Sequence, residues 1–432
     1  MVAKPSPPDN QIPASNDDIA IDVPVQRRRF RLPNSLSALA YRDYQLLWVG
    51  TFTTQTGQWV QVVAIGWLML ELAPVDSGFY LGLAGFLRSV PQLFFSLPAG
   101  IMADRVDRRR LLVISQGTAA GLTLLLTILV ASGSIQVWQL LLLTFLIGSA
   151  MAMVFPVRQT LVPSTVPRRD LASAVTLNST NNNVTRTLGP ALAGVMIAAV
   201  GVPLCFLAQS IGLFISLVTS AMLRIPGRDL ARARSSPMGD LREAFAYIRR
   251  TPTVSGLLLA AAVPTVLGMP YLSLLPLFAR DLDIGATGLG FLMTVVGAGS
   301  IAGSIILTAA GTTRRIGWIM LGAAAGFGIS LLCLALSNSV TTAMISLVFT
   351  GGFSAVYQAA NNTLLQTTVP DALRGRVLSF YILTWGMMPL GTLPLGWLSD
   401  HMGAAFSVGL SGTLVILFSL ILIVRAPALR KI

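Results

Sequence analysis

Long apolar segments constrain the fold of this chain more than any other feature of its sequence. Twelve segments of roughly 20 apolar residues recur along the 432-residue chain, and each is long enough to cross about 30 Å of hydrocarbon. We therefore expect an all-α polytopic membrane protein with twelve transmembrane helices. The spans are centred on 46–72, 78–102, 111–131, 137–156, 172–200, 203–223, 253–279, 286–309, 317–337, 341–360, 377–398 and 403–424.

Charged residues are scarce, and their placement predicts the orientation of the spans. They make up 11% of the chain, against about 25% in soluble domains. With the N-terminus inside, the arginines collect in the even-numbered turns and the central loop, as cytoplasmic loops require. Only Arg280 is assigned to an outside loop, and only Arg88 and Arg186 to spans. Both termini are predicted to be cytoplasmic, and the net charge of +13 indicates topology rather than a nucleic-acid partner.

The polar segment 224–252 divides the chain into two sets of six spans. We expect a cytoplasmic tail at 1–42, one six-helix bundle at 43–223, a cytoplasmic central loop at 224–252, a second bundle at 253–425 and a cytoplasmic tail at 426–432. The halves share a repeat, because 160–167 (TLVPSTVP) matches 363–370 (TLLQTTVP) at five of eight positions with an offset of 203. Such a duplication predicts a pseudo-two-fold axis along the membrane normal, with substrate near the midplane between the halves.

The N-terminal tail is polar and rich in proline, a composition typical of disorder. Its basic stretch at 27–31 is interpreted as a juxtamembrane anchor. A twin-arginine export signal is the alternative, but the first span is longer than a signal's apolar region and eleven more spans follow.

The chain lacks the residue clusters that catalysis or metal binding requires. Its two cysteines, Cys205 and Cys333, fall in spans of opposite halves, so a disulfide framework is not expected. The single histidine, His401, belongs to no group with metal-ligand spacing. We expect no metal, no cofactor and no enzymatic activity.

The stretch 100–110, GIMADRVDRRR, carries the most specific motif in the chain. It resembles the major facilitator superfamily marker Gly-x-x-x-Asp-Arg/Lys-x-Gly-Arg/Lys-Arg/Lys. The matching residues are Gly100, Asp104, Arg105, Arg108 and Arg109, while Asp107 replaces the second glycine. The resemblance extends over about 40–425, and the surrounding motifs are similar to those of the branch that holds the enterobactin exporter and the macrolide efflux proteins.

The resemblance implies that this stretch is a cytoplasmic gate that stabilises the outward-facing state. Asp104 at a helix end can accept backbone N–H groups from a neighbouring helix N-terminus. Arg105 and Arg108 can pair with carboxylates or with last-turn carbonyls on adjacent helices. The alternative is a tight turn with arginines that only set the topology.

Polar side chains follow one face of the first span. Thr51, Thr54, Gln55, Gln58 and Gln61 lie within an arc of roughly 120° at about 100° per residue. Lipid cannot satisfy amide groups, so this face is predicted to look into the bundle or a wet cavity. Hydrogen bonding between helices explains the same stripe.

Two arginines are predicted near mid-depth of the membrane. Asn178, Asn182 and Arg186 are spaced four apart in span five, and Arg88 lies in span two. An arginine at that depth is a functional hypothesis by default. An anionic substrate is one candidate counter-charge, and backbone carbonyls or polar side chains are the other.

Further candidates come from small and aromatic residues. Gly189, Pro190 and Gly194 resemble the antiporter motif of drug/proton exporters and predict a helix that bends. Three prolines at 264, 270 and 276 favour bending in span seven. The second half offers six candidate cavity residues, which are Tyr357, Gln358, Asn361 and Asn362 near the inner end of span ten and Tyr381 and Trp385 in span eleven.

The sequence therefore favours a secondary active exporter of the bacterial inner membrane that works by alternating access. The expected substrate is a small amphipathic organic molecule, a siderophore or an antibiotic, carried by a monomer. The resemblance implies protons as the coupling ion, although no Asp or Glu falls at mid-depth of a span. The alternatives are an importer or lysolipid flippase of the same fold, and a transport-inactive sensor.

The two copies of the gating turn differ, and this difference generates a prediction. The second copy, GTTRR at 311–315, lacks the aspartate. Asp104→Asn is therefore expected to impair transport far more than Arg314→Ala, measured as the initial export rate at matched membrane expression. Equal losses would contradict a gate centred on Asp104.

Overall fold

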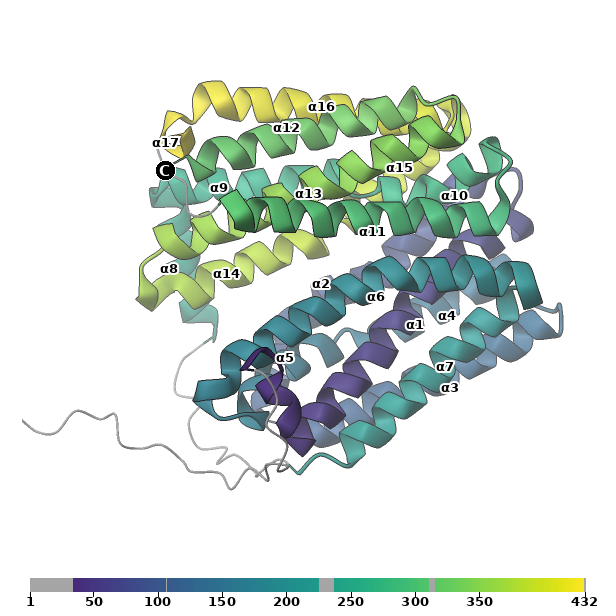
Figure 1. Ribbon diagram of the computed structural model, residues 1–432, viewed down its shortest axis with the longest axis horizontal. Helices are drawn as coiled ribbons and strands as arrows, with labels where there is room; N and C mark the ends of the chain where they lie inside the picture. The colour runs from purple at the N-terminus through teal and green to yellow at the C-terminus, as the bar shows by residue number, and fades with distance from the viewer. Residues whose placement is uncertain (1–33, 106, 225–236, 311–314, 431–432) are drawn as a thin grey trace, which may run out of the picture.

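A computed structural model of the protein describes residues 34–105, 107–224, 237–310 and 315–430. Those residues form helices and connecting turns without any strand. Figure 1 shows two groups of helices, one from each half of the chain, which we call the N-bundle and the C-bundle. The N-bundle consists of α1 (Arg42–Leu72), α2 (Ser77–Arg105), α3 (Arg108–Ala131), α4 (Val137–Met151), α5 (Val154–Thr165), α6 (Leu171–Val200) and α7 (Val202–Ala221). The C-bundle consists of α9 (Pro252–Val263), η5 (Pro264–Gly268), α10 (Tyr271–Asp281), α11 (Gly285–Ala310), α12 (Ile316–Ala335), α13 (Val340–Thr368), α14 (Asp371–Gly386), α15 (Pro389–Met402) and α16 (Ala404–Arg425).

The helices agree with the apolar segments of the sequence. Each predicted span overlaps one helix, or one helix interrupted by a turn. Among the described residues, nine stretches are long and apolar enough to cross a membrane by length and composition, and α4 is a shorter apolar helix. The expectation of an all-α polytopic membrane protein is confirmed.

Three of the spans are discontinuous. The helix of span seven changes to a π-helical turn, η5, at Pro264, and α10 starts only after Pro270. A proline removes one backbone donor, and π-helical turns are frequent at functional sites. Span eleven breaks between α14 and Pro389, and span four breaks between α4 and α5. Pro264 and Pro270 therefore mark the irregular part of span seven, whereas Pro276 lies inside the continuous helix α10.

The central segment is only partly a loop. The sequence assigns 224–252 to a polar loop, whereas its second part is the helix α8 (Pro237–Arg250). This helix is amphipathic, because Ala244 and Ile248 are buried while charged residues occupy its other face. Glu243 forms an ion pair with Arg376, which fixes α8 against α14. The loop assignment was wrong for these residues because they are too polar to register as an apolar span.

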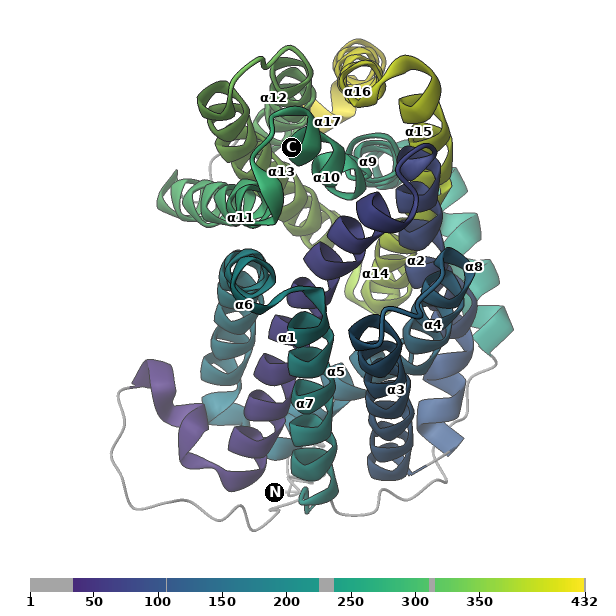
Figure 2. The same cartoon turned by 90° about the vertical axis from the view of Figure 1, so that its right-hand side faces the viewer.

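The two ends of the molecule differ in how the bundles meet. We call the end where α3 begins at Arg108 and α8 ends at Arg250 the arginine-rich end. The opposite end is where α2 begins at Ser77 and α16 begins at Ala404. In Figure 1 the ribbons of the two bundles lie close together at the opposite end and diverge toward the arginine-rich end. Figure 2 shows the molecule from the opposite end.

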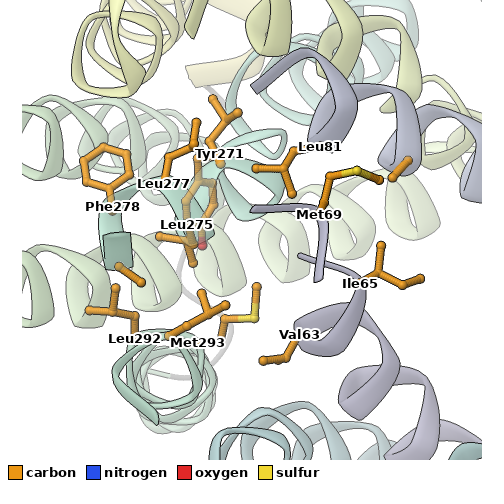
Figure 3. Packing of buried hydrophobic residues seen from close by; sticks show 14 of the residues in the cluster. Val63, Ile65, Met69, Leu81, Tyr271, Leu275, Leu277, Phe278, Leu292 and Met293 are labelled. Atoms are coloured by element: carbon orange, nitrogen blue, oxygen red, sulfur yellow. The ribbon is translucent and has the colours of Figure 1, made fainter. Parts of the chain in front are cut away.

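One hydrophobic cluster joins both bundles at the opposite end. Figure 3 shows Ile65 and Met69 of α1 beside Tyr271 and Leu275 of α10, with Met293 of α11 nearby. At the arginine-rich end the described residues form two separate clusters instead. One contains N-bundle residues such as Tyr44 and Leu112, and the other contains C-bundle residues such as Leu257 and Leu364. The two bundles therefore share one packed cluster at the opposite end and are packed separately at the arginine-rich end.

Glycines bring the helix backbones into contact across that closed end. A Cβ atom added to Gly290 of α11 would lie 2.6 Å from the carbonyl oxygen of Pro190 in α6. A Cβ atom on Gly82 of α2 would lie 2.5 Å from the carbonyl oxygen of Thr392 in α15. Small residues permit such close approach in membranes, where dispersion contacts hold helices together.

Glycines also pack α11 against α13 within the C-bundle. Cβ atoms added to Gly297, Gly299 and Gly303 would lie 2.6, 2.1 and 2.4 Å from Thr187, Val348 and Gly352. Two of these contacts are with α13 and one is with α6 across the bundle interface.

This packing generates a prediction for Gly351. A Cβ atom there would lie 2.0 Å from the Val296 carbonyl oxygen, so Gly351→Ala is expected to destabilise the protein by about 1–3 kcal/mol. In the control Gly322→Ala the added methyl group meets nothing within 4 Å, and alanine favours a helix by about 1 kcal/mol. Thermal unfolding in detergent should give a lower midpoint for the first variant only. Equal midpoints would contradict the packing argument.

Candidate functional site

A polar pocket lies inside the N-bundle, in the half nearer the arginine-rich end. Helices α1, α5 and α6 form its walls together with the end of α4, and we call it the N-bundle pocket. It contains no carboxylate among its lining residues, which are Tyr44, Leu47, Trp48, Thr51, Thr54, Gln55, Gln58, Met151, Val154, Arg158, Gln159, Val162, Asn178 and Asn182. Two aromatic rings and several amides give it both apolar and polar walls.

The polar stripe of α1 faces this pocket. Thr51, Thr54, Gln55 and Gln58 all line it, whereas Gln61 is buried and takes no part in the lining. The Nε2 atom of Gln55 also donates a hydrogen bond of 2.5 Å to Oδ1 of Asn182 in α6. Cavity lining and hydrogen bonding between helices, the two interpretations of the stripe, therefore coexist at Gln55.

The stripe of α6 leads from the pocket to the bundle interface. Asn178 and Asn182 line the pocket, and Arg186 follows one turn later, a rise of about 6 Å. Tyr271 and Tyr357 of the C-bundle are the electrostatic neighbours of its guanidinium. No hydrogen bond or ion pair connects Arg186 to another residue that the structure describes. Arg186 therefore lies between the two bundles.

Arg88 lies on α2 at a different place. Its carbonyl oxygen would be 2.6 Å from a Cβ atom on Gly148, so α2 and α4 are in close contact there. The side chain is exposed and, within the described part of the chain, forms neither a hydrogen bond nor an ion pair. The structure does not bring Arg88 into the N-bundle pocket.

The C-bundle candidates lie outside the N-bundle pocket. Tyr357 is 1% exposed and packs in the shared hydrophobic cluster, with its ring centroid 5.8 Å from that of Phe327. Gln358 follows it on α13 and is half-buried. On α14, Tyr381 is half-buried and Trp385 is exposed.

The gating motif is only partly within the described residues. The side chains of Gly100, Asp104 and Arg105 lie outside them, as do residue 106 and the second copy at 311–314. Asp107, which replaces the glycine of the family marker, is the N-cap of α3 and accepts a hydrogen bond of 2.9 Å from the Arg109 backbone. The substitution is therefore explained, because aspartate is a preferred N-cap residue. The Arg109 guanidinium donates to the carbonyl oxygen of Ala221, which fastens α3 to α7.

An ionic contact at the opposite end was missed by the sequence. The carboxylate of Asp400, near the end of α15, accepts hydrogen bonds of 2.7 and 2.6 Å from the backbone N–H groups of Gly78 and Phe79. These N–H groups belong to the first turn of α2, where the helix dipole favours a negative charge. Beside them, Arg280 of α10 donates a bond of 2.9 Å to Ser77 Oγ. We call the contact of Asp400 with Gly78 and Phe79 the α2–α15 clasp.

The antiporter-like residues lie at helix contacts. A Cβ atom on Gly189 would be 2.5 Å from Cβ of Trp59 in α1, and one on Gly194 would be 3.1 Å from the Ala286 carbonyl oxygen in α11. Pro190 is inside α6, which continues as one helix to Val200. The segment thus packs α6 against both bundles.

Arg158 is the charged pocket residue that the sequence does not single out. The charge pattern groups it with the arginines at or near the cytoplasmic face, and the structure buries it on α5, where it is 9% exposed. Its burial is not predicted because the apolar stretch of span four ends at 156, two residues before it. The repeat offset of 203 was the signal that could have found it, because it pairs Arg158 with Asn361, a polar residue near the inner end of span ten.

Comparison with known proteins gives relatives along almost the whole chain. A family model described as transmembrane secretion effector matches residues 34–431. The staphyloferrin A transporter of Staphylococcus aureus is 28% identical over 86% of this chain and 93% of its own length. Macrolide efflux protein A of Streptococcus pyogenes is 22% identical over 88% and 96% of the two chains. The enterobactin exporter EntS of Citrobacter koseri is 24% identical over 87% and 91%.

Solved transporters share the fold. A bacterial homolog of the human lysosomal transporter Spinster superposes with a TM-score of 0.71 at 15% identity, covering 90% of this chain and 97% of its own. A D-xylose–proton symporter gives a TM-score of 0.69 at 12% identity, covering 90% and 98%. The sequence match and the shared helical architecture lead to the same conclusion. The chain belongs to the major facilitator superfamily of membrane transporters, within the family of transmembrane secretion effectors.

Proposed function

We propose that this transporter exports a small amphipathic organic molecule, such as a siderophore or an antibiotic, by alternating access driven by the proton gradient. The bacterial inner membrane is the proposed location, with both termini in the cytoplasm. We propose that the monomer is the transporting unit.

The arrangement of hydrophobic contacts is the observation that carries this proposal. The bundles share one cluster at the opposite end and have separate clusters at the arginine-rich end, among the described residues. Arginine-rich loops favour the cytoplasmic side. With that orientation, the described arrangement corresponds to a state that is open toward the cytoplasm. The N-bundle pocket is then on the side from which an exported molecule enters.

The pocket supports an amphipathic substrate. Ligand sites combine apolar and aromatic walls with a few convergent polar groups, and Tyr44 and Trp48 lie opposite amide side chains here. We assign substrate binding to Gln55, Gln58, Asn178 and Asn182, with Arg88 and Arg186 as contacts nearer mid-depth. The C-bundle is proposed to contribute Tyr357, Gln358, Tyr381 and Trp385 when the bundles close over the substrate.

The names of the relatives support the substrate class and the direction. Two of them refer to siderophores, staphyloferrin A and enterobactin, and a third to macrolides. Two of the three names also state efflux or export. We therefore favour export over import or lipid flipping.

Alternating access requires a contact at each end that is made in one state and lost in the other. We propose that the motif with Gly100, Asp104, Arg105, Asp107, Arg108 and Arg109 holds the arginine-rich end closed in the outward-facing state. The α2–α15 clasp is proposed to hold the opposite end closed in the inward-facing state. Gly189, Pro190 and Gly194 are proposed to let α6 move against α11.

The clasp generates a prediction for Asp400→Asn. The variant loses a charge and one acceptor, and a hydrogen bond to a charged group contributes about 1.5–3 kcal/mol. The outward-open population is therefore expected to rise about tenfold or more, since 1.4 kcal/mol corresponds to a factor of ten. The measurement is the labelling rate of Ala286→Cys, a buried position at the closed end, by an impermeant maleimide in a background without Cys205 and Cys333.

Asp76→Asn is the matched control for this experiment. Asp76 is an exposed aspartate next to the same helix end, and its side chain has no hydrogen bond to the C-bundle in the described structure. Its labelling rate should remain that of the parent protein. If Asp400→Asn also labels at the parent rate, the clasp does not hold the closed end.

Transport itself is tested in energised inside-out vesicles. We expect accumulation of enterobactin, staphyloferrin A or a macrolide in vesicles that contain the protein, compared with vesicles that lack it. A protonophore should abolish the accumulation if protons drive export. Entry of substrate only into right-side-out vesicles would overturn the proposed direction, and accumulation that persists with the protonophore would overturn proton coupling.

A further inference from the structure

Arg158 carries a buried positive charge at the wall of the N-bundle pocket. Its Nη2 atom donates to the Gly50 carbonyl oxygen and to Thr54 Oγ1, both at 3.3 Å, and to the hydroxyl of Ser216. All three acceptors are uncharged. The Nε atom is buried and has no hydrogen-bond partner among the described residues.

Among the residues that the structure describes, no carboxylate forms an ion pair with Arg158. Arginine remains protonated in proteins, and neither Asp nor Glu occurs among the residues that line the pocket. An uncompensated charge in the protein interior costs several kcal/mol. Such a charge therefore destabilises the protein unless a ligand compensates it, so stability does not explain why the position is an arginine.

The second half of the chain has an uncharged residue at the position equivalent to Arg158, so the structural role of this position can be compared with and without the charge. The repeat offset of 203 pairs Arg158 of α5 with Asn361 of α13. Asn361 is completely buried, and its Nδ2 atom donates a bond of 2.9 Å to the Leu257 carbonyl oxygen of α9. Arg158 likewise donates to a backbone carbonyl of α1, the first helix of its own bundle.

Both residues therefore fasten the fourth helix of a bundle to the first helix of the same bundle. In the C-bundle a neutral amide is sufficient for this contact. The positive charge of Arg158 must therefore have a role that the corresponding position in the C-bundle lacks. The surroundings of Arg158 differ from those of Asn361 in the N-bundle pocket, where Gln55, Asn178 and Asn182 converge beside Arg158.

We propose that Arg158 is a specificity-determining residue that binds the carboxylate group of an organic anion in the N-bundle pocket. Charge-assisted bonds from a guanidinium to a carboxylate are about twice as strong as bonds between neutral groups. The amides bind hydroxyl or amide groups of the same molecule, and the rings of Tyr44 and Trp48 cover its apolar part. This inference rests on the proposed function, since it names the charge of the molecule that is carried.

Equilibrium binding to the purified protein tests the charge preference directly. The probes are two matched pairs, salicylate with salicylamide and 1-naphthylacetate with 1-naphthylacetamide, which differ in charge at nearly the same shape. Binding is followed by quenching of tryptophan fluorescence, because Trp48 lines the pocket. The wild-type protein is expected to bind each carboxylate at least tenfold more tightly than its amide.

Three variants separate the charge from the fold. Arg158→Asn introduces the residue of the second repeat, so it is expected to remain folded while binding of the carboxylates falls tenfold or more and binding of the amides changes less than twofold. Arg158→Lys keeps the charge and should restore part of the preference. Arg110→Asn is the control for surface charge, because Arg110 is exposed at the same end and pairs with Asp107 at 3.8 Å. It should leave both affinities unchanged.

Several results would overturn the inference. These are equal binding of carboxylate and amide by the wild type, absence of carboxylate binding, and equal loss of both ligands in Arg158→Asn. Displacement of the carboxylates by phosphatidylglycerol in nonionic detergent would instead assign the charge to a lipid headgroup. The proposed export function fails in a different experiment, by absence of transport in vesicles, and a charge preference in binding would persist in that case.

Discussion

The structure depends on one constraint, which is that hydrocarbon offers no hydrogen-bond partner to a polar group. It forces the backbone of each span to pair within its own helix. Breaks in that pairing then require a protein environment. The π-helical turn at Pro264–Gly268 lies against α16, where the Ser411 hydroxyl donates to the Leu267 carbonyl oxygen. A Cβ atom added to Gly391 of α15 would lie only 1.8 Å from the neighbouring Val266 carbonyl oxygen, so only glycine fits against the turn there. Irregular backbone is therefore found where other helices cover it.

The same constraint decides how the helices attract one another. Lipid is as apolar as a leucine side chain, so burial of apolar surface alone does not favour helix contacts in a membrane, and close packing and hydrogen bonds become important. The contacts between the bundles at the opposite end are of this kind, with glycines at 82, 194, 290 and 396 and the carboxylate of Asp400 on a helix N-terminus. In such contacts the helix surfaces of the two bundles are rigid, so they are either in close contact or fully separated. They are suited to a protein with two discrete arrangements of the same bundles.

Much of the fold follows from the sequence because hydropathy and helical periodicity are local properties. The all-helical membrane architecture and the inward orientation of Thr51, Thr54, Gln55 and Gln58 required only segment length and about 100° of rotation per residue. The missed features depend on contacts between distant segments. In the sequence, Asp400 is one of several polar residues at the end of a span. Only the tertiary structure places it beside the start of α2, 322 residues earlier in the chain. Arg158 looks like a loop residue because hydropathy falls at Pro156, while the tertiary structure encloses α5 between α1 and α6. The sequence does not predict the helix α8 because its apolar face is short.

The two halves of the chain share a scaffold but differ in the chemistry of their corresponding positions. The repeat gives the two bundles a common architecture, and a common architecture needs no identity of side chains. Recognition of an asymmetric molecule requires the side chains to differ. Val154 in the N-bundle pocket corresponds to Tyr357, which packs on Phe327. Arg158 corresponds to Asn361, which is buried and donates a hydrogen bond to the Leu257 carbonyl oxygen. At these positions the N-bundle has a charge where the C-bundle has an amide, and the C-bundle has an aromatic ring where the N-bundle has a valine. A molecule with a polar, anionic part and an apolar part would have one preferred orientation between them, and the polar part would enter the N-bundle pocket first.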